Sequence, residues 1–345
     1  MLYLYIFSIS IYLHHHTMIW KNNEYHTCTS NNLLKFSPSA PLFATSTNDS
    51  DNDNWKQIQL WKIPNNSNNS NNSNNSMHMN ATPQTPIHIF KGHTSSIHSL
   101  AFHPNDNQLI SGSYGGSIHI YDLNSTMQTL HGHMHAVTSV CHHPHSDGIL
   151  GSGSYDTNVR VWDVRAKNSI YVYKDHHKDP ITCVEFSPDG QWMVSSCQNG
   201  CIVLWDLIAG KQMYKWDVGM MMMMKKNMNP ISIQFHTEEL VMGLLMNNFK
   251  FLLYDLTTWK LLDSMESMNG GFVLKDCIVN GHKCNWLSFH DNCMKLWSWK
   301  SCIDVIPIPW NQGRIKDIIV KHEINDTVYV GTMDHNFTSI WTCSH

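Results

Sequence analysis

The sequence predicts an all-β fold, a seven-bladed β-propeller, from three observations. First, a unit of small residues, a turn, alternating apolar residues and a final aromatic-Asp pair recurs, as in GSGSYDTNVRVWDV at 151–164. Second, most of the closing aromatic residues follow one another at intervals of 41 to 49 residues, close to the roughly 40–45 residues of a four-stranded blade. Third, the units open alike, as in HHKDPITCVEFSPDG at 176–190.

Seven units follow one another along the chain. Their closing aromatic residues are, in order, Trp61, Tyr121, Trp162, Trp205, Tyr254, Trp297 and Trp341. Alternation such as IHSLAF (97–102) indicates half-buried strands, and the FSPDG piece (186–190) indicates a turn. Seven such units suit closure, because radial repetition leaves only short and protected sheet edges.

The propeller is expected to span residues 17–345, preceded by an unassigned apolar leader at 1–16. The Asn/Ser-rich stretch at about 64–86 is expected to be a disordered loop insertion between the third and fourth strands of the first blade. Since no fourth strand follows Trp341, residues 17–24 are expected to supply the outer strand of the last blade.

The composition excludes several classes of function. Lys and Arg number 23 against 27 Asp and Glu, for a net charge of −4, so the chain lacks the basic surface that nucleic acid requires. The apolar leader has no basic n-region and no cleavage site, and at about 13 residues it is too short to span a bilayer. We therefore expect a cytoplasmic protein with no nucleic-acid or membrane partner.

The ten cysteines predict buried thiols in a reducing compartment, because residues such as Cys141, Cys183 and Cys201 lie inside apolar runs. Metal binding is the alternative for three groups of residues. These are HGHMH (131–135), HHPH (142–145) and the set Cys277, His282, Cys284 and Cys293. Their spacing follows the expected strands and turns and forms no zinc knuckle. No metal and no cofactor are therefore predicted.

The period, the opening Gly-His, the turn and the closing Trp-Asp together resemble the WD40 repeat family. The resemblance implies a hydrogen-bonded tetrad in the third blade, made of His133, Ser152, Asp156 and Trp162. A buried indole N–H needs an acceptor, which Ser152 supplies, and His133 would link Ser152 to Asp156. A nucleophilic Ser–His–Asp triad is the alternative, but nothing supplies an oxyanion hole. No catalytic residue and no enzymatic activity are predicted.

The other blades depart from this pattern. Gly115 stands at the aspartate position of the second blade and Asn199 at that of the fourth, while the fifth and sixth blades keep almost none of the tetrad. We therefore expect the third blade to be the most rigid. The fifth to seventh blades are expected to depend on packing alone.

One face of the propeller is predicted to bind partners. In the family, residues just before the turn aspartate point out of one face, and neighbouring loop residues join them. Aromatic residues near the centre of such a face are natural hot spots, although exposed tyrosines are also ordinary on protein surfaces. The predicted face comprises Tyr114, Tyr155, Gln198, His135, Lys178 and Asp179.

Two segments are similar to the WD40-containing regulatory subunit, B1, of katanin: TMIWKNNEYHT (17–27) and KLWSWKSCIDVIPIPWNQGRIKDI (295–318). The resemblance implies a non-catalytic subunit that targets a microtubule-severing AAA ATPase to centrosomes and spindle poles. Implied partners are this ATPase, microtubules and spindle-pole proteins, in the cytoplasm and cytoskeleton. In that family a further helical C-terminal domain grips the ATPase. This chain stops at TSIWTCSH, so we expect a truncated isoform, a partial gene model or a diverged homologue.

A second function competes with this one. Trp162, Asp163 and Arg165 match the WDxR box, by which many propellers dock to the adaptor of cullin-type ubiquitin ligases, with Arg165 reaching the adaptor. On this alternative the chain is a substrate receptor of such a ligase. The two functions are compatible with each other.

Overall fold

The computed structural model describes most of the chain, and every statement below concerns that part. The described residues are 19–26, 33–48, 56–63, 85–105, 107–122, 127–218, 229–236, 240–248, 250–265, 272–279, 282–290, 293–299, 301–307, 314–321, 327–333 and 337–344. The leader at 1–16 and nearly all of the Asn/Ser-rich insertion lie outside these ranges. Within them, no helix has both the length and the apolarity needed to cross a membrane.

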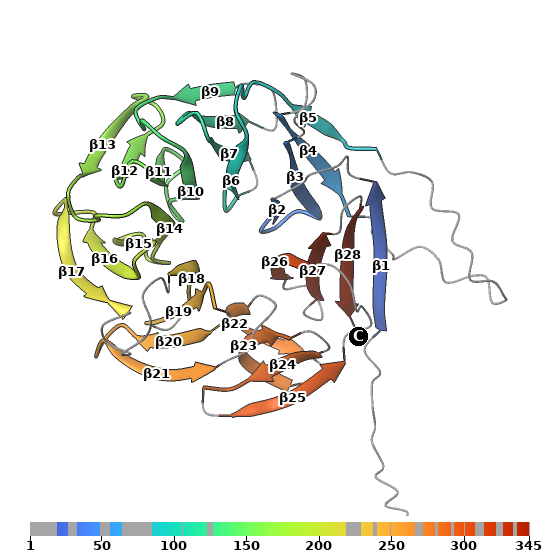
Figure 1. Cartoon of the computed structure of the whole chain (residues 1–345). Helices are drawn as coiled ribbons and strands as arrows, with labels where there is room; N and C mark the ends of the chain where they lie inside the picture. Colours follow the sequence, from blue (N-terminus) through green and yellow to red (C-terminus); the bar gives the residue numbers. More distant parts are fainter. Residues whose placement is uncertain are drawn as a thin grey trace, which may run out of the picture.

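Seven four-stranded antiparallel sheets stand side by side around a common centre (Figure 1). This confirms the predicted all-β propeller. The blades, with strands in order from the centre outward, are as follows. Blade one is β2 (Leu34–Phe36), β3 (Leu42–Asn48), β4 (Lys56–Lys62) and β5 (His88–Phe90); blade two is β6 (Ile97–Phe102), β7 (Gln108–Ser113), β8 (Ile118–Asp122) and β9 (Met127–Leu130); blade three is β10 (Val137–His142), β11 (Ile149–Ser154), β12 (Val159–Asp163) and β13 (Asn168–Tyr173).

The remaining blades follow the same order. Blade four is β14 (Ile181–Phe186), β15 (Trp192–Cys197), β16 (Cys201–Asp206) and β17 (Lys211–Asp217); blade five is β18 (Pro230–Phe235), β19 (Val241–Met246), β20 (Phe251–Asp255) and β21 (Lys260–Met265); blade six is β22 (Phe272–Val279), β23 (His282–Phe289), β24 (Cys293–Trp297) and β25 (Cys302–Pro307); blade seven is β26 (Arg314–Lys321), β27 (Thr327–Met333), β28 (Phe337–Ser344) and β1 (Ile19–His26).

The ring closes between the two ends of the chain. Strand β1 pairs with β28 in an antiparallel ladder that runs from Ile19 opposite Ser344 to His26 opposite Phe337. In Figure 1 the blue arrow of β1 therefore lies beside the dark red arrow of β28. This pairing covers the backbone edge of β28, which would otherwise be open to another chain.

The core is divided among the interfaces between neighbouring blades. Between blades two and three, for example, Ile110 and Leu130 pack with Val140 and Trp162 in one buried cluster. Two neighbouring blades can pack closely against each other only where the side chains between them are small. A Cβ atom on Gly153 would lie 2.3 Å from Cγ2 of Ile181 in the next blade. The glycines of the GSGS motif are thus required by the packing of one blade on the next.

The innermost strands surround a central cavity of about 880 Å³. Its wall includes Lys35 from blade one, His98 from blade two and Glu185 from blade four. Burial raises the pKa of Glu185 to about 7, and the charge of Lys35 opposes that rise. The cavity is thus lined by a carboxyl group, that of Glu185, which is partly protonated near neutral pH.

Candidate protein-interaction face

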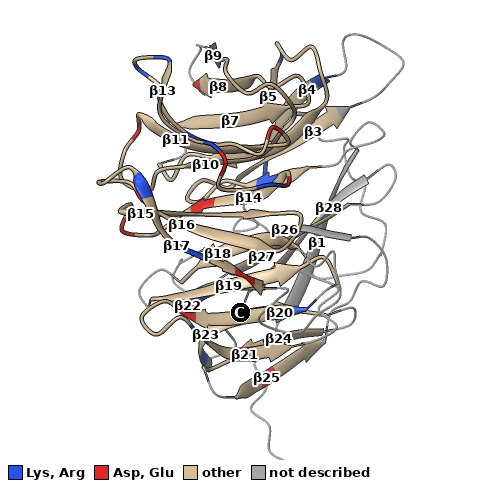
Figure 2. Cartoon of the chain, turned by 60° about the vertical axis from the view of Figure 1, so that its left-hand side comes forward, with Lys and Arg blue, Asp and Glu red and all other residues tan. Residues whose placement is uncertain are grey.

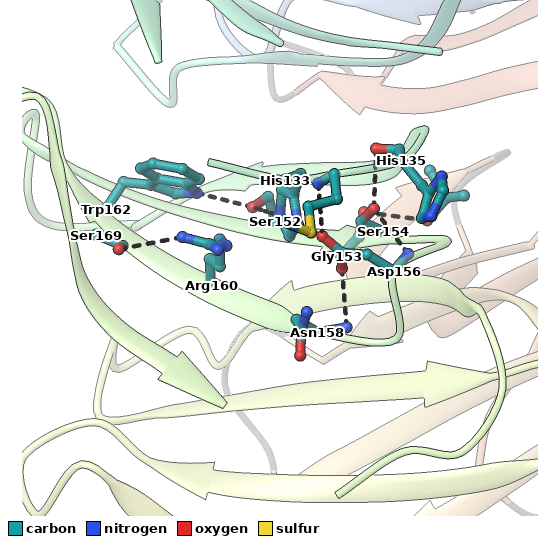
Figure 3. Close-up of polar contacts among 12 residues, drawn as sticks. His133, His135, Ser152, Gly153, Ser154, Asp156, Asn158, Arg160, Trp162 and Ser169 are labelled. Carbon is teal, nitrogen blue, oxygen red and sulfur yellow. Dashed lines mark hydrogen bonds and ion pairs between the residues drawn. The ribbon is translucent and has the colours of Figure 1, made fainter. Parts of the chain in front are cut away.

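The four predicted tetrad residues lie together in blade three (Figure 3). The indole Nε1 of Trp162 donates a hydrogen bond of 2.8 Å to Ser152 Oγ. Ser152 Oγ is 2.7 Å from His133 Nε2, and His133 Nδ1 is 2.9 Å from Asp156 Oδ2. The network joins the inner part of the sheet to the loop that precedes the blade.

Asp156 also holds the backbone of two loops. Its Oδ2 accepts a 3.0 Å hydrogen bond from the backbone N–H of Met134, and its Oδ1 accepts one of 3.0 Å from Asn158. Burial favours the protonated acid, but His133 and these N–H groups outweigh it and hold the pKa of Asp156 well below its usual range. Burial lowers the pKa of His133, although the neighbouring Asp156 carboxylate opposes this lowering. At neutral pH the pair is a carboxylate and a neutral imidazole.

The buried position of Ser152 excludes the nucleophilic interpretation of this triad. Its side chain is 0% exposed, and its oxygen already accepts the indole N–H of Trp162. Arg160 lies 5.5 Å above the same indole ring. A substrate carbonyl therefore has no route to Ser152 Oγ, and the role of the four residues is to stabilise the blade.

The acceptor for the closing tryptophan recurs in other blades, in blade four as the motif predicts and elsewhere without a complete tetrad. Ser195 accepts from Trp205 at 2.8 Å and Thr45 from Trp61 at 3.0 Å. Blades six and seven repeat the contact through different residues. Trp297 donates to Ser288 at 2.8 Å and Trp341 to Thr332 at 3.2 Å. The prediction that blades five to seven depend on packing alone is thus wrong for blades six and seven, because Ser or Thr on the neighbouring strand replaces the full tetrad.

The residues predicted for the partner-binding face lie at one end of the propeller. Tyr114, Tyr155 and Gln198 occupy equivalent turns between the second and third strands of blades two, three and four. Tyr114 is 65% and Tyr155 49% exposed. His135 and Lys178 are also exposed, while Asp179 is half-buried.

These residues form a continuous surface across three blades. The Gln198 side-chain amide donates a 3.2 Å hydrogen bond to the hydroxyl of Tyr155. The turn that carries Tyr114 packs on the loop before blade three, where a Cβ on Gly116 would lie 2.5 Å from the His133 carbonyl oxygen. We call the exposed set Tyr114, Met134, His135, Tyr155 and Gln198 the tyrosine face.

The WDxR box lies at the opposite end of blade three. Trp162 is buried inside the tetrad. Asp163 Oδ1 accepts backbone N–H groups of Arg165 and Ala166 at 2.8 and 3.2 Å. Asp206 in blade four closes its turn in the same way. The Trp and Asp of the box thus serve the blade itself, and only Arg165 is fully exposed.

Charge does not distinguish the surface. In the view of Figure 2, Lys and Arg lie singly among Asp and Glu and form no continuous basic stripe. The mixed pattern agrees with the net charge of −4. The tyrosine face thus presents aromatic and hydrogen-bonding groups rather than a concentration of one charge.

Of the cysteines proposed as alternative metal ligands, Cys277 and Cys284 face each other across β22 and β23, with sulfur atoms 3.2 Å apart. They form a buried pair inside blade six. Among the described residues, the three side chains that do meet with metal-ligand geometry are His177, Cys197 and Cys201, in blade four. The sequence analysis missed this group, although a Cys-x3-Cys spacing with a histidine 20 residues upstream was visible.

The repeats match a known family description over part of the chain. WD domain, G-beta repeat, matches residues 84–122, 124–163 and 167–206. Each matched stretch starts on the outermost strand of one blade and continues through the three inner strands of the next. The sequence repeat is therefore offset by one strand from the structural blade, which is why the first and last strands of the chain share blade seven.

Several known proteins are similar to part of this chain. The chain is 35% identical over 133 residues to the COMPASS component SWD3 of Saccharomyces cerevisiae, covering 36% of this chain and 42% of that protein. It is 30% identical over 128 residues to a guanine nucleotide-binding protein subunit beta of Oryza sativa, covering 34% of this chain and 33% of that protein. It is 24% identical over 131 residues to the target of rapamycin complex subunit wat1 of Schizosaccharomyces pombe, covering 38% of this chain and 41% of that protein. The chain spans less than half the length of these relatives.

Proposed function

We propose that this chain, a β-propeller built from WD40 repeats, is a non-catalytic platform that binds protein partners through the tyrosine face. The observation that carries the proposal is the double role of Asp156. The same carboxylate anchors the loop that presents Met134 and the turn that presents Tyr155. Exposed side chains are thus held on a fixed backbone.

Such preorganisation favours binding because little conformational freedom remains to be lost when a partner docks. Tyrosine suits this role, since a large ring with only two side-chain torsions offers apolar contact and a hydroxyl together. Tyr114 stands beside the ring of His98 at 5.7 Å between centroids, and His98 lines the central cavity.

The names of the similar proteins support a role within an assembly. They describe a COMPASS component, a G-protein subunit and a subunit of the target of rapamycin complex. None of these names describes an enzymatic activity of the propeller itself. By analogy, the present chain acts as one subunit of a larger complex.

A finer version of the proposal identifies that complex as katanin. It rests on the resemblance of residues 17–27 and 295–318 to the katanin regulatory subunit, segments that contribute β1 of blade seven and β24 and β25 of blade six. On this version the chain directs the severing ATPase to microtubules, centrosomes and spindle poles in the cytoplasm. The tyrosine face, on blades two to four, would contact the spindle-pole proteins.

The cullin-type ligase is the second candidate, and the exposure of Arg165 at the opposite end of blade three favours it. Because Trp162 and Asp163 are engaged within the blade, the adaptor would recognise Arg165 and the turn around it. This version predicts a binding end different from that of the first, so point variants separate them.

Affinity capture of the full chain from cells tests both versions. Three variants are compared with the unchanged protein: Tyr114→Ala/Tyr155→Ala, Arg165→Ala, and Ile208→Ala as the control. Ile208 is 80% exposed on the β16–β17 turn, away from the tyrosine face. We expect the tyrosine variant to lose at least about tenfold of the captured spindle-pole proteins, as for a hot-spot pair worth about 1.4 kcal/mol or more.

The control should capture these proteins as the unchanged chain does. Loss of the cullin adaptor in the Arg165 variant alone would support the second function. Unchanged capture by the tyrosine variant, with an unchanged melting temperature, would contradict the assignment of the face.

A further inference from the structure

Blade four carries an incomplete tetrad. His177 Nε2 lies 2.7 Å from Ser195 Oγ, which also accepts the indole of Trp205. Asn199 stands where blade three has Asp156, and its Oδ1 accepts the backbone N–H of Cys201 at 2.9 Å. His177 is only 3% exposed, yet its Nδ1 makes no well-aligned hydrogen bond.

Two buried thiols lie beside this imidazole. Cys197 ends β15 and Cys201 begins β16, and since Ser196 pairs with Ile202, the two cysteines are opposite each other across the tight turn. Gly200 completes that turn with a φ of 84°. One ring nitrogen of His177 and both sulfur atoms all lie within 4.8 Å of one another.

We propose that His177, Cys197 and Cys201 form a binding site for a soft metal ion, best matched to Zn²⁺. Tetrahedral zinc has Zn–S distances of about 2.3 Å and Zn–N distances of about 2.0–2.1 Å, so its ligand atoms are about 3.4–3.8 Å apart. The three atoms, now within 4.8 Å of one another, therefore need to close by at most about 1.4 Å, within the range of a side-chain rotation. Binding displaces the two thiol protons to solvent and leaves two thiolates and a neutral imidazole on the ion.

The loss of the aspartate makes the histidine available. In blade three, Asp156 accepts the Nδ1–H of His133, which leaves no lone pair at that nitrogen. In blade four no carboxylate stands there, so Nε2–H can donate to Ser195 Oγ and the Nδ1 lone pair is free for a metal. The contact between Nε2 and Ser195 then orients the ring, as outer-shell hydrogen bonds do at zinc sites.

Solvent can reach the fourth position of the ion. A cavity of about 240 Å³ borders Cys201 and Asn199 and is also lined by Lys178 and Lys215. A water molecule or an anion can enter there to complete a tetrahedron. Three protein ligands with one open position is the arrangement of metal sites that keep exchangeable coordination.

Blade two shows that an unpaired histidine alone is not such a site. His93 also has an unpartnered Nδ1, because Gly115 replaces the aspartate. The neighbour of His93 is the stacked ring of His119, 3.8 Å away between centroids. In the described part of the chain, no group with metal-ligand geometry includes His93. Among the described residues, a histidine and two thiols meet with metal-ligand geometry in blade four, where the carboxylate is missing.

Cobalt titration of the reduced full chain tests the proposal, because charge-transfer absorption from thiolate to Co²⁺ reports sulfur ligands. It therefore ignores the many other histidines of this chain. We expect one equivalent of Co²⁺ to produce this band, and Zn²⁺ to displace it. Cys197→Ser and Cys201→Ser should each weaken binding by about 100-fold or more, beyond the 10–100-fold typical of outer-shell losses.

Cys183→Ser is the matched control, a thiol on β14 of the same blade but outside the cluster, and it should bind the metal unchanged. Thermal unfolding with Zn²⁺ gives a second readout: saturating metal should raise the melting temperature of the unchanged chain and of the control, but not of the two serine variants. Absence of the thiolate band in reduced protein would overturn the site. The proposal would be overturned equally if the protein were isolated with a Cys197–Cys201 disulfide and did not bind the metal after that disulfide was reduced.

Discussion

Asp156 and Asn199 occupy the same turn position in adjacent blades, and only Asp156 contacts a histidine ring. Both side chains use Oδ1 to accept the backbone N–H two residues later, from Asn158 at 3.0 Å and from Cys201 at 2.9 Å. The second oxygen of Asp156 reaches His133 at 2.9 Å. The two blades therefore differ by the contacts of one carboxylate oxygen, and that difference can be measured.

Asp156→Ala is expected to lower the free energy of unfolding by about 1–3 kcal/mol, since a buried imidazole N–H loses its acceptor. Asn199→Ala should cost about 1 kcal/mol less, because it removes the turn contact and the weak hydrogen bond from the Cys197 thiol but no partner of a histidine ring. Asp156→Asn retains the Oδ1 contact and should fall between the two. Chemical denaturation of the three variants measures these differences, and equal losses for Asp156→Ala and Asn199→Ala would contradict the role of the tetrad.

Acid should destabilise the propeller from about pH 6.5 downward. Burial lowers the pKa of His93 and His142 to about 3 and of His119 to about 4, whereas in the unfolded chain each titrates near 6.5. Between these values the unfolded chain binds more protons, so stability falls as pH falls, by up to about 1.4 kcal/mol per pH unit for each group.

Asp156 adds to this loss at lower pH, because its depressed pKa gives stability above about pH 4 that disappears on further acidification. Melting temperatures measured from pH 7.5 to pH 4 check the histidine part. His119→Phe, which removes one titrating ring from the stack with His93, should flatten the curve. A constant melting temperature over that range would show that these rings take up protons in the folded chain as readily as in the unfolded chain.

Ser288→Ala should destabilise blade six by about 1–3 kcal/mol, since the indole N–H of Trp297 loses its acceptor at 2.8 Å. Ser298→Ala is the control: its hydroxyl contacts the backbone of an exposed turn, and it should change stability by less than about 0.5 kcal/mol. Thermal unfolding of both variants compares them. Matching losses would mean that packing alone sustains this blade.

Gly153→Ala should cost about 1–3 kcal/mol through overpacking between blades three and four. The new methyl group would lie 2.3 Å from Ile181 Cγ2 and 2.7 Å from Val184 Cγ2. Gly148→Ala introduces a methyl group whose nearest neighbour is Arg165 Nε at 3.6 Å, so it serves as the control with little effect. Denaturation midpoints distinguish them, and an unaffected Gly153 variant would contradict the close approach of the two sheets.

Local pattern was sufficient to predict the repeat, because each blade is built from contacts between strands that are close in sequence. The alternation in IHSLAF and the turn of FSPDG fix strand and hairpin locally, and β6 and β14 form where these patterns stand. Departures from the tetrad motif predicted less well which blades keep a hydrogen bond to the closing tryptophan. Ser288 and Thr332 accept their tryptophans although neither blade has the complete tetrad motif, since an indole needs one oxygen nearby and not a whole motif.

The sequence by itself therefore determined the all-β repeat, the seven-bladed ring and the residues that close each blade, because strand alternation and turn chemistry act over a few residues. The sequence also predicted an outer strand for the last blade from residues 17–24, where β1 pairs with β28, and one face for Tyr114, Tyr155 and Gln198. Which side chains meet as partners became visible only in the tertiary structure, as for Thr332 and Trp341 in blade seven. The gathering of His177, Cys197 and Cys201 likewise depends on how a loop folds over a hairpin, which sequence spacing does not specify.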